Sequence, residues 1–556
     1  MTRHMTTGQA FFCGGIATVA VLAAQLTAET PGGHAAQAPA QGAAAAAQTA
    51  QAPATYDLVI RNGRVLDGDG NPWFCADIGV RGDRIVAVGD LRDARATRDI
   101  DATGLYVAPG FIDTHTHTGP GLATETLGAA APQLAEGITT VFVNPDGEGQ
   151  LDLAAQRAAF VKAGIAVNVA QFVPHGPVRE AVLGKEDRHP TAAELDRMRA
   201  LVRTGMQEGA WGLSSGPFYF PQSFADTQEF VEMARVAAAF GGAYQSHIRD
   251  ESDYNVGVIA AVEEVITVAR EAKLPSIVTH IKALGPGVWG FANAMALRIE
   301  RARAEGLEVW ADQYPYTAGA TSLAAALLPR WAQAGGDAAL QQRLADPATR
   351  AKIRGEMAEN LVRRGGAASL QFRRVLQDPT IEGRTLEAVA RERATDPLDV
   401  ALAIFAKGNA SVVSFAMIED DVRTFLRKPW VMTASDGDLV PFGQGVPHPR
   451  SYGTFPRKLQ RYVVDEPVIT LDQAIRSMTS LPARVFRMPD RGELRPGAIA
   501  DIVVFDLARV RERATYAQPH QLSEGMVHVF VNGRAAISDG KVTGDRAGRV
   551  LRRDGR

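Results

Sequence analysis

The chain has 556 residues, of which 46% are hydrophobic and 22% are charged, as is usual for a globular protein. Lys and Arg (59) nearly balance Asp and Glu (62), so the composition predicts neither a nucleic-acid-binding surface nor an acidic disordered tail. The two cysteines, Cys13 and Cys75, are too few for a disulfide framework or a cysteine-based zinc site. The length suits a barrel of roughly 250–400 residues with one or two attachments.

Residues 1–28 have the pattern of a secretory signal peptide: a weakly basic start, an apolar stretch, and a cleavage site expected after Leu26-Thr27-Ala28. Residues 29–55 are nearly all Ala, Gln, Gly and Pro, which predicts a flexible linker. We therefore expect a periplasmic or secreted protein without a stable membrane anchor. The alternative is a cytoplasmic protein with a disordered Ala-rich extension.

Two β-rich segments flank a long central section. Over 56–104, apolar and polar residues alternate around the hairpin turn signals Asn62-Gly63 and Gly82-Asp83. A matching pattern occupies 485–545 and includes the run ADIVVFDLARV. We expect these two segments to form one small β-sandwich built from both ends of the chain.

The central section, 105–484, alternates strand-like and helix-like patterns. Eight short apolar runs are candidate parallel strands: 105–113, 139–144, 167–173, 209–214, 242–247, 275–280, 308–313 and 430–435. Such alternation is typical of an α/β fold, the TIM-type (β/α)8 barrel. The gap between the seventh and eighth runs is too long for one helix. It predicts an insertion over about 318–429, with helical patterns at 337–366.

Chemically active residues follow these predicted strands. Four of the nine histidines outside the N-terminal region end strand runs, and two acidic residues follow others: His115, His117, His247, His280, Asp146 and Asp436. Active sites of such barrels lie at the C-terminal ends of the strands. One histidine alone is more often a hydrogen-bonded buried residue, but imidazoles and carboxylates that converge on one mouth suit Zn²⁺. The sequence therefore predicts a site for one or two divalent metals.

The segments that carry these residues resemble the amidohydrolase superfamily and, within it, the D-aminoacylases, or N-acyl-D-amino-acid deacylases. The resemblance runs from about Tyr56 to Asp545. It is carried by PGFIDTHTH, GITTVFV, WGLSSGPFY, YQSHIRDE, VTHIKALG, DQYPYTAG, SDG and PHPRSYGTFPR. The first and seventh of these are shared across the superfamily, whereas SHIRDE and HPRSYGTFPR are more specific to this branch.

This resemblance implies a reaction, the metal-dependent hydrolysis of the amide bond of an N-acyl amino acid, with N-acyl-D-amino acids as the expected substrates. The metal makes water nucleophilic. Asp436, also a ligand, accepts the proton of the water and passes it to the leaving nitrogen. By the same resemblance, Lys282 and Tyr314 hold the α-carboxylate of the substrate, and Ser322 is a weaker candidate for that role.

The chain departs from the D-aminoacylase pattern after the second strand, where that family has a metal-binding cysteine. The aligned stretch here is Asn144-Pro145-Asp146-Gly147, and WGLSSGPFY lacks the lysine that other superfamily members carboxylate near the fourth strand. We therefore expect Asp146 to be the bridging or tight ligand, with Glu148 as its substitute. An oxygen ligand in place of a sulfur ligand is also compatible with Mn²⁺ and Co²⁺, so these metals are alternatives to zinc. Alternatively, Asp146-Gly147 only forms a turn.

Further residues are expected around the pocket. Arg249 lies two residues after His247, and Lys282 two after His280, so strand parity directs both toward the mouth. Two cations there suit a substrate carboxylate. Arg249 has an alternative, pairing with Asp250 or Glu251 as support for the ligands. The stretch His448-Pro449-Arg450 follows the eighth run and is expected to line the pocket, with His448 in a supporting role rather than as a metal ligand.

Other functions share these features. A cyclic-amide hydrolase or dipeptidase of the same superfamily would use the same metal residues, and a non-catalytic barrel scaffold is the alternative from another class. The expected partner is a small-molecule substrate and not a nucleic acid. The acyl group, the preferred side chain and the oligomeric state are not predicted by the sequence.

Overall fold

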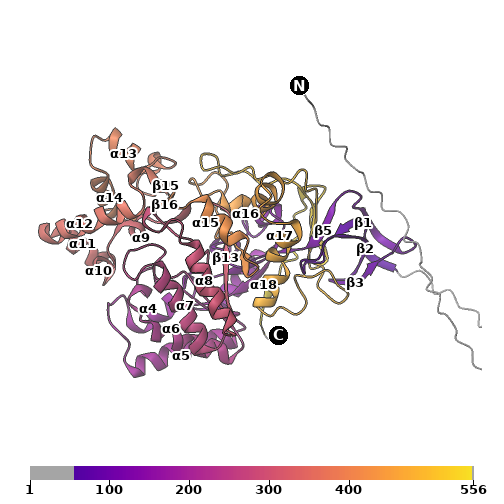
Figure 1. Ribbon diagram of the computed structural model, residues 1–556, viewed down its shortest axis with the longest axis horizontal. Coiled ribbons are helices and arrows are strands. Elements are labelled where there is room, and N and C mark those ends of the chain that lie inside the picture. Colours follow the sequence, from indigo (N-terminus) through magenta and orange to yellow (C-terminus); the bar gives the residue numbers. More distant parts are fainter. Residues whose placement is uncertain (1–54, 554–556) are drawn as a thin grey trace, which may run out of the picture.

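The computed structural model describes residues 55–553. Figure 1 shows a β-sheet at one end, a central α/β barrel and a lobe at the other end. The predicted signal peptide, residues 1–28, and the predicted linker lie outside the described residues, except that Thr55 is the first residue of β1 (Thr55–Val65). Within residues 55–553, no helix combines the length and the apolar character needed to cross a bilayer.

Each of the eight predicted strand runs overlaps a barrel strand. The strands are β6 (Phe111–Asp113), β7 (Ile138–Val143), β8 (Asn168–Gln171) with β9 (Val173–Pro174), β10 (Gly212–Ser215), β11 (Ala243–Ser246), β12 (Ser276–Val278), β13 (Val309–Gln313) and β17 (Val431–Thr433). They pair in parallel and in chain order as two arcs, β6-β7-β8 and β9-β10-β11-β12-β13-β17. Helices cover the outer face, so both faces are buried and the runs are apolar throughout rather than alternating.

The helices that follow the strands are defined by their caps and apolar faces. In α5 (Ala192–Gln207), Thr191 and Glu194 form a capping box, which satisfies the free N–H groups at the start of the helix. In α6 (Thr227–Ala239), Phe230, Met233 and Ala237 are buried in the same apolar core as residues of α7 (Val258–Ala272) and α8 (Ala292–Ala304). Burial of each large apolar side chain stabilises this layer by roughly 1.5–3 kcal/mol.

One nine-stranded sheet joins the two ends of the described chain. Its order is β21-β20-β19-β18-β5-β1-β2-β3, and β4 also pairs with β1. Besides β1, the strands are β2 (Phe74–Arg81), β3 (Arg84–Gly89), β4 (Arg95–Asp101), β5 (Tyr106–Pro109), β18 (Ile502–Phe505), β19 (Met526–Val531), β20 (Arg534–Ser538) and β21 (Lys541–Val542). The strand β18 lies antiparallel to both β5 and β19.

The first predicted run, 105–113, is divided between two sheets. Its first part is β5 in the nine-stranded sheet, and its second part is β6 in the barrel. Gly110 separates them, and a Cβ atom at this position would lie 2.2 Å from the Thr139 hydroxyl oxygen. Only glycine fits there, so the chain can turn from one sheet into the other. The sequence pattern is apolar on both sides and does not indicate the division.

Between β13 and β17, the chain forms an insertion lobe (residues 319–414). A small antiparallel sheet has the order β14 (Gly319–Ser322), β16 (Ser411–Ser414), β15 (Leu370–Arg374). Its helices are α9 (Leu323–Leu327), α10 (Arg330–Gln333), α11 (Asp337–Ala345), α12 (Pro347–Arg363), α13 (Leu386–Glu392) and α14 (Pro397–Phe405). The lobe has an apolar cluster of its own. The helical pattern at 337–366 is confirmed, whereas the sheet was not predicted.

Candidate functional site

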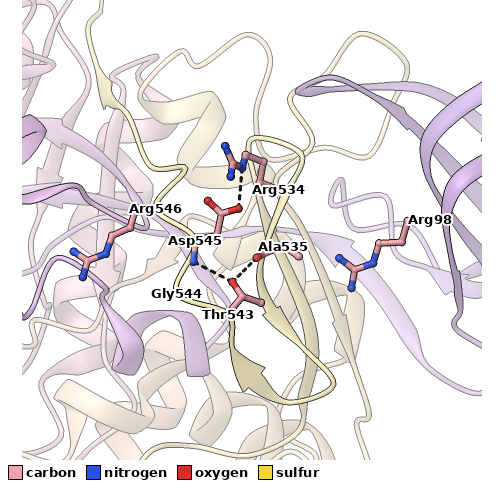
Figure 2. A pocket seen from close by; sticks show the side chains of 7 residues that line it. All are labelled: Arg98, Arg534, Ala535, Thr543, Gly544, Asp545 and Arg546. Atoms are coloured by element: carbon pink, nitrogen blue, oxygen red, sulfur yellow. Dashed lines mark hydrogen bonds and ion pairs between the residues drawn. The ribbon is translucent and has the colours of Figure 1, made fainter.

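Two cavities differ in what lines them. One lies on the nine-stranded sheet and is lined by Arg98, Arg534, Ala535, Thr543, Gly544, Asp545 and Arg546 (Figure 2). Its cations are engaged, since Arg534 pairs with Asp545 at 2.8 Å and Arg546 donates to backbone carbonyls. The other cavity lies at the C-terminal ends of the barrel strands. Its lining includes most of the residues that the sequence singled out.

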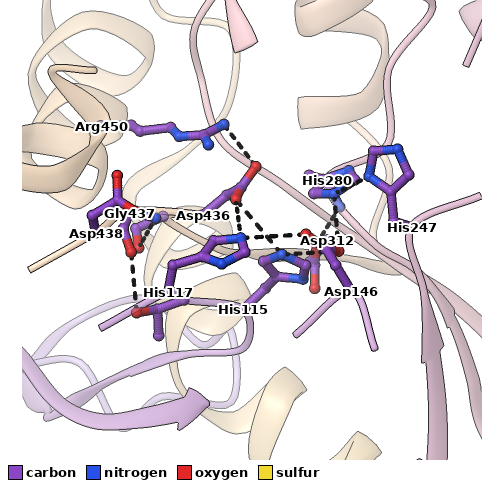
Figure 3. Close-up of polar contacts among 12 residues, drawn as sticks. His115, His117, Asp146, His247, His280, Asp312, Asp436, Gly437, Asp438 and Arg450 are labelled. Carbon is purple, nitrogen blue, oxygen red and sulfur yellow. Dashed lines mark hydrogen bonds and ion pairs between the residues drawn. The ribbon is translucent and has the colours of Figure 1, made fainter. Parts of the chain in front are cut away.

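The barrel-mouth cavity contains two groups of side chains with the composition of metal sites. The first is His115, His117, Asp146 and Asp436, and the second is Asp146, His247 and His280. In each group, the nitrogen and oxygen atoms that could bind a metal lie within 4.8 Å of one another. Figure 3 shows these side chains converging from segments that follow different barrel strands. The structure thus brings together all six residues that were predicted as ligands.

Asp146 lies at the centre of this arrangement because it belongs to both groups. Its Oδ1 atom is 3.4 Å from Nε2 of His115 and 3.4 Å from Nε2 of His280. Its Oδ2 atom is 3.2 Å from Nε2 of His117. Asp436 approaches from the opposite side, with Oδ1 3.2 Å from Nε2 of His117. A carboxylate between two sets of imidazoles has the position of a bridging ligand.

Several of these atoms have no hydrogen bond within residues 55–553. They are both ring nitrogens of His115, Nε2 of His247 and Oδ1 of Asp146, and all are buried. Buried polar atoms without partners cost free energy, so native structures rarely leave them unpaired. Imidazole nitrogen and carboxylate oxygen are the donors that zinc and neighbouring divalent metals accept. The residues present therefore fit a divalent metal.

The electrostatics of the site favour charged carboxylates and at least one neutral imidazole. Burial lowers the pKa of His247 to about 3, which keeps this ring neutral, the form that binds a metal. Burial alone would raise the pKa of Asp436, but the Arg450 guanidinium and His280 outweigh it and hold that pKa well below its usual range. Asp436 is therefore a carboxylate at neutral pH and can accept a proton.

Three of the site residues adopt left-handed backbone conformations. The φ angles are 55° at Asp146, 36° at His280 and 50° at Asp436. Such conformations are costly for residues with a Cβ atom and cluster at functional sites. Here each occurs directly beyond a barrel strand, where it turns the side chain into the cavity. The sequence placed these residues correctly at strand ends but gives no sign of this turn.

Two buried acids that sequence reasoning missed hold the loops of the ligands. Asp113 accepts hydrogen bonds from the backbone N–H groups of Ser435 at 2.9 Å and His115 at 3.3 Å. Asp312 accepts one from the N–H of His280 at 2.5 Å. Burial raises the pKa of Asp113 to about 7. Each acid lies within a barrel strand at its C-terminal end, and that position is the signal that could have identified them.

The Lys282 side chain lines the cavity, where its ammonium group contacts two other side chains. Its Nζ atom donates to Oε1 of Glu251 at 2.5 Å and lies 2.7 Å from Nδ1 of His280. It also lies 5.6 Å from the centre of the Tyr314 ring, whose buried hydroxyl has no hydrogen bond to any described residue. The structure therefore places Lys282 and Tyr314 together beside the histidines. Glu251, which the sequence suggested only as a partner of Arg249, holds Lys282 instead.

Arg450 is a site residue that the sequence placed near the pocket only as part of His448-Pro449-Arg450, without a role of its own. It is the first residue of α16 (Arg450–Leu459) and is buried. Its Nη1 atom lies 2.6 Å from Oδ2 of Asp436, and its guanidinium lies 4.7 Å from the Tyr314 ring centre. Arg450 thus connects the expected proton shuttle to the expected substrate-binding residue.

Four further candidates do not line the cavity. Arg249 pairs with Glu264 at 2.7 Å, not with Asp250 or Glu251, because β11 ends at Ser246 and strand parity no longer applies. Ser322 caps α9 by accepting from the N–H of Ala325. His448 binds two backbone groups, the carbonyl of Ala318 and the N–H of Arg450. Glu148 is exposed and belongs to neither ligand group.

A parallel α/β barrel with histidines and aspartates at its strand ends is the arrangement of a metal-dependent hydrolase. The family model described as "Amidohydrolase family" matches residues 98–537, and the chain belongs to this family. An N-acyl-D-glutamate deacylase of Alcaligenes xylosoxydans xylosoxydans is 36% identical over 518 residues, 90% of this chain and 97% of that protein. A D-aminoacylase of the same organism is 34% identical over 521 residues, 90% and 98% of the two chains.

Comparison with solved structures gives the same family. A D-aminoacylase structure that concerns a binuclear metal center has a TM-score of 0.77 at 34% identity, covering 90% of this chain and all of that one. An N-acyl-D-glutamate deacylase from Bordetella bronchiseptica, complexed with zinc and a phosphonate inhibitor that mimics the tetrahedral intermediate, has a TM-score of 0.75 at 34% identity and the same coverage. The predicted family and the predicted fold, a TIM-type barrel with a β-sandwich, are confirmed.

Proposed function

We propose that this protein is a metal-dependent deacylase that hydrolyses the amide bond of N-acyl-D-amino acids to a carboxylate and a free amino acid. The convergence of His115, His117, Asp146, His247, His280 and Asp436 on one cavity carries this proposal. The names of the similar proteins, D-aminoacylase and N-acyl-D-glutamate deacylase, support the D configuration and the linear amide.

The same six residues would hold the metal. When bound, a divalent metal makes water nucleophilic at neutral pH and polarises the amide carbonyl. Asp436 accepts the proton of the attacking water and delivers it to the leaving nitrogen, so that the amine departs neutral. Arg450 binds Oδ2 of Asp436, so Oδ1 is left facing His115 and His117.

The identity and number of metals belong to the proposal as well. Zn²⁺ is supported by the zinc in the similar B. bronchiseptica deacylase, and two ions are supported by the two ligand groups that share Asp146. Mn²⁺ or Co²⁺ is the alternative, because all six ligands offer nitrogen or oxygen and none offers sulfur. Residues 1–28 support export to the periplasm or medium as a further part of the proposal.

A substrate panel tests this function. The purified protein is assayed with N-acetyl D- and L-amino acids after chelation and after addition of zinc, manganese or cobalt. We expect the D compounds to be hydrolysed, chelation to abolish the activity and one of these metals to restore it. Full activity of metal-free protein would refute the mechanism. Metal binding without hydrolysis of any compound would favour a non-catalytic barrel.

Replacement of Lys282 by methionine tests how the α-carboxylate of the substrate is held. We expect the variant to lose about ten- to a hundredfold in kcat/KM for N-acyl amino acids, because a charge-assisted hydrogen bond is worth roughly 1.5–3 kcal/mol. The matching amides, which carry no charge at that position, should lose much less. The measured quantity is the acid-to-amide ratio of kcat/KM.

This ratio matters because Lys282 also holds Glu251, so the variant can lower both activities together. Arg249→Met is the matched control, since Arg249 is a nearby cation that points away from the cavity. It should leave the acid-to-amide ratio unchanged. Equal losses for acid and amide in Lys282→Met would show that Lys282 only supports the structure.

A further inference from the structure

The turn at Asp146 is held from outside the cavity by buried side chains that take no part in the chemistry above. The nearest is Gln222, which is buried and begins the short 3-10 helix η1 (Gln222–Phe224). Its Nε2 atom donates to the backbone carbonyl of Asp146 at 2.8 Å, and its Oε1 atom accepts from the backbone N–H of Gly216 at 2.8 Å. Gln222 thus joins the turn after β7 to the residue that follows β10.

These two contacts fix the orientation of the Gln222 amide. The reversed amide would turn its oxygen toward the carbonyl oxygen of Asp146 and its NH₂ group toward the N–H of Gly216, and both hydrogen bonds would be lost. The Oε1 atom is therefore an acceptor. It also faces Nδ1 of His175 at 3.2 Å, so this ring nitrogen is the donor of that contact.

His175 is in turn held by a buried carboxylate. It is the first residue of α4 (His175–Leu183), and its Nε2 atom lies 2.9 Å from Oε1 of Glu229. The Nη1 atom of Arg179 donates to Oε2 of Glu229 at 2.5 Å. Burial raises the pKa of Glu229, but His175 and Arg179 outweigh burial and bring that pKa below its usual value, so Glu229 is charged and accepts from both. A buried polar chain therefore leads to Asp146, formed in order by Arg179, Glu229, His175 and Gln222.

Close packing leaves the turn no room to move away from this chain. The backbone N–H of Gly176 donates to the carbonyl of Gly147 at 2.9 Å. A Cβ atom at Gly176 would lie 2.7 Å from that carbonyl oxygen, and a Cβ atom at Gly147 would lie 2.0 Å from Oε1 of Gln222. The carbonyl groups of Asp146 and Gly147 are thus both bound, by segments that follow β9 and β10.

The turn requires support because the φ angle of Asp146 is 55°. Left-handed conformations are unfavourable for a residue with a Cβ atom and persist only where surrounding contacts impose them. In this conformation the carboxylate of Asp146 belongs to both ligand groups. None of the four side chains of the buried polar chain lines the cavity, so the contact of Gln222 with Asp146 is their link to the metal site.

We propose that Gln222 and His175 are positioning residues for the metal site, which hold the backbone of Asp146 so that its carboxylate lies between the two ligand groups. The proposal rests on the metal site of the proposed function and adds residues that touch neither metal nor substrate. Partners that orient metal ligands contribute about 10- to 100-fold to metal affinity. We expect a loss of that size when the buried polar chain is interrupted.

Titration of metal-free protein with Zn²⁺ and Co²⁺ tests this role without any substrate. Gln222→Met keeps the length of the side chain but loses the donor to Asp146, so the affinity for both metals should fall by about 10- to 100-fold. The visible absorption of bound Co²⁺, which depends on the arrangement of its ligands, should change as well. Gln222→Glu keeps an acceptor for Gly216 and His175 but turns a second oxygen toward the Asp146 carbonyl, and it should lose at least as much.

Gln313→Met is the matched control. Gln313 is a buried glutamine at the end of β13, and its Nε2 atom donates to the backbone carbonyl of Val422, which belongs to neither ligand group. This variant should keep the wild-type affinity and the wild-type Co²⁺ spectrum. An equal loss in the control would show that any buried amide near the barrel mouth has the same effect, and would overturn the proposal.

Interruption of the chain at a second point tests whether its members act together. His175→Phe removes the donor to Gln222 and keeps an aromatic ring beside Phe230, whose ring centre lies 4.6 Å from that of His175. It should lower metal affinity as Gln222→Met does. The double variant should lose no more than about twofold beyond the larger single loss, because both changes break one chain. Losses that multiply would mean two independent structural effects and would also overturn the proposal.

The unfolding temperature of each metal-free variant shows that it is folded, and Gln222→Glu and His175→Phe carry the test if Gln222→Met does not fold. Wild-type affinity and spectrum in the folded variants would overturn the proposal, even if the protein hydrolyses N-acyl-D-amino acids. The expected loss of affinity supports it, even if the protein hydrolyses none of them. A wild-type protein that binds no metal would refute both this proposal and the proposed function.

Discussion

Asp436→Asn is expected to lower kcat by about 10²–10⁴, the range that general acid–base catalysis contributes. An asparagine has nearly the same shape but cannot accept the proton of the attacking water or pass it to the leaving nitrogen. Because the change affects turnover more than binding, KM should change much less than kcat. The measurement is steady-state kinetics on the best N-acetyl-D-amino acid from the panel.

Asp436 is also an expected ligand, so metal content must be measured in the same preparation. A large fall in kcat at full metal content assigns the loss to proton transfer. Asp438→Asn is a control with a nearby carboxylate, because Asp438 pairs with Arg373 and belongs to neither ligand group. Its effect on kcat should be far smaller. If Asp436→Asn keeps more than about a tenth of wild-type kcat, another group moves the proton.

Asp146→Ala is expected to weaken metal binding by at least about tenfold and to remove most of the activity at limiting metal. Asp146 belongs to both ligand groups, and its Oδ1 lies between His115 and His280 without a hydrogen-bond partner in residues 55–553. Its removal takes away an anionic ligand that offsets the positive charge of the metal. Titration of metal-free protein with zinc and manganese measures the affinity.

Two further variants at this position separate charge from ligand type. Asp146→Cys should restore binding and shift the preference toward zinc, since a thiolate is the softer ligand. Asp146→Asn should be intermediate, because it keeps an oxygen but loses the charge. Glu148→Gln is the matched control, since Glu148 is exposed and outside both groups. Wild-type affinity in Asp146→Ala would show that this aspartate only forms a turn.

The barrel was predictable because its strands are buried on both faces and therefore appear as short apolar runs between helical patterns. The division at Gly110 was not, because β5 and β6 are equally apolar and only a close contact with Thr139 reveals the turn. The sheet of the insertion lobe was missed for a similar reason. Its strands are short and pair with one another across long stretches of helix.

Within the site, the histidines and aspartates were identified by their positions at the ends of predicted strands. This was possible because the active site of such a barrel lies at the C-terminal ends of its strands, a rule that depends only on chain order and topology. Strand parity failed for Arg249 because the strand had already ended, and the side chain turns to Glu264. The roles of Arg450 and Glu251 were not predicted because they depend on contacts with Asp436 and Lys282 from distant segments.

The position of β18 between β5 and β19 has a consequence for how the protein is made. On the ribosome, β5 emerges early, together with β6 and the loop of His115 and His117 that follows it. Its partner β18, residues Ile502–Phe505, is synthesised near the end of translation. Until then one edge of β5 lacks the strand that covers it, and uncovered edges invite pairing with other chains. Completion of the mouth of the barrel therefore waits for nearly the whole chain, and a product truncated before β18 should aggregate rather than form a smaller active enzyme.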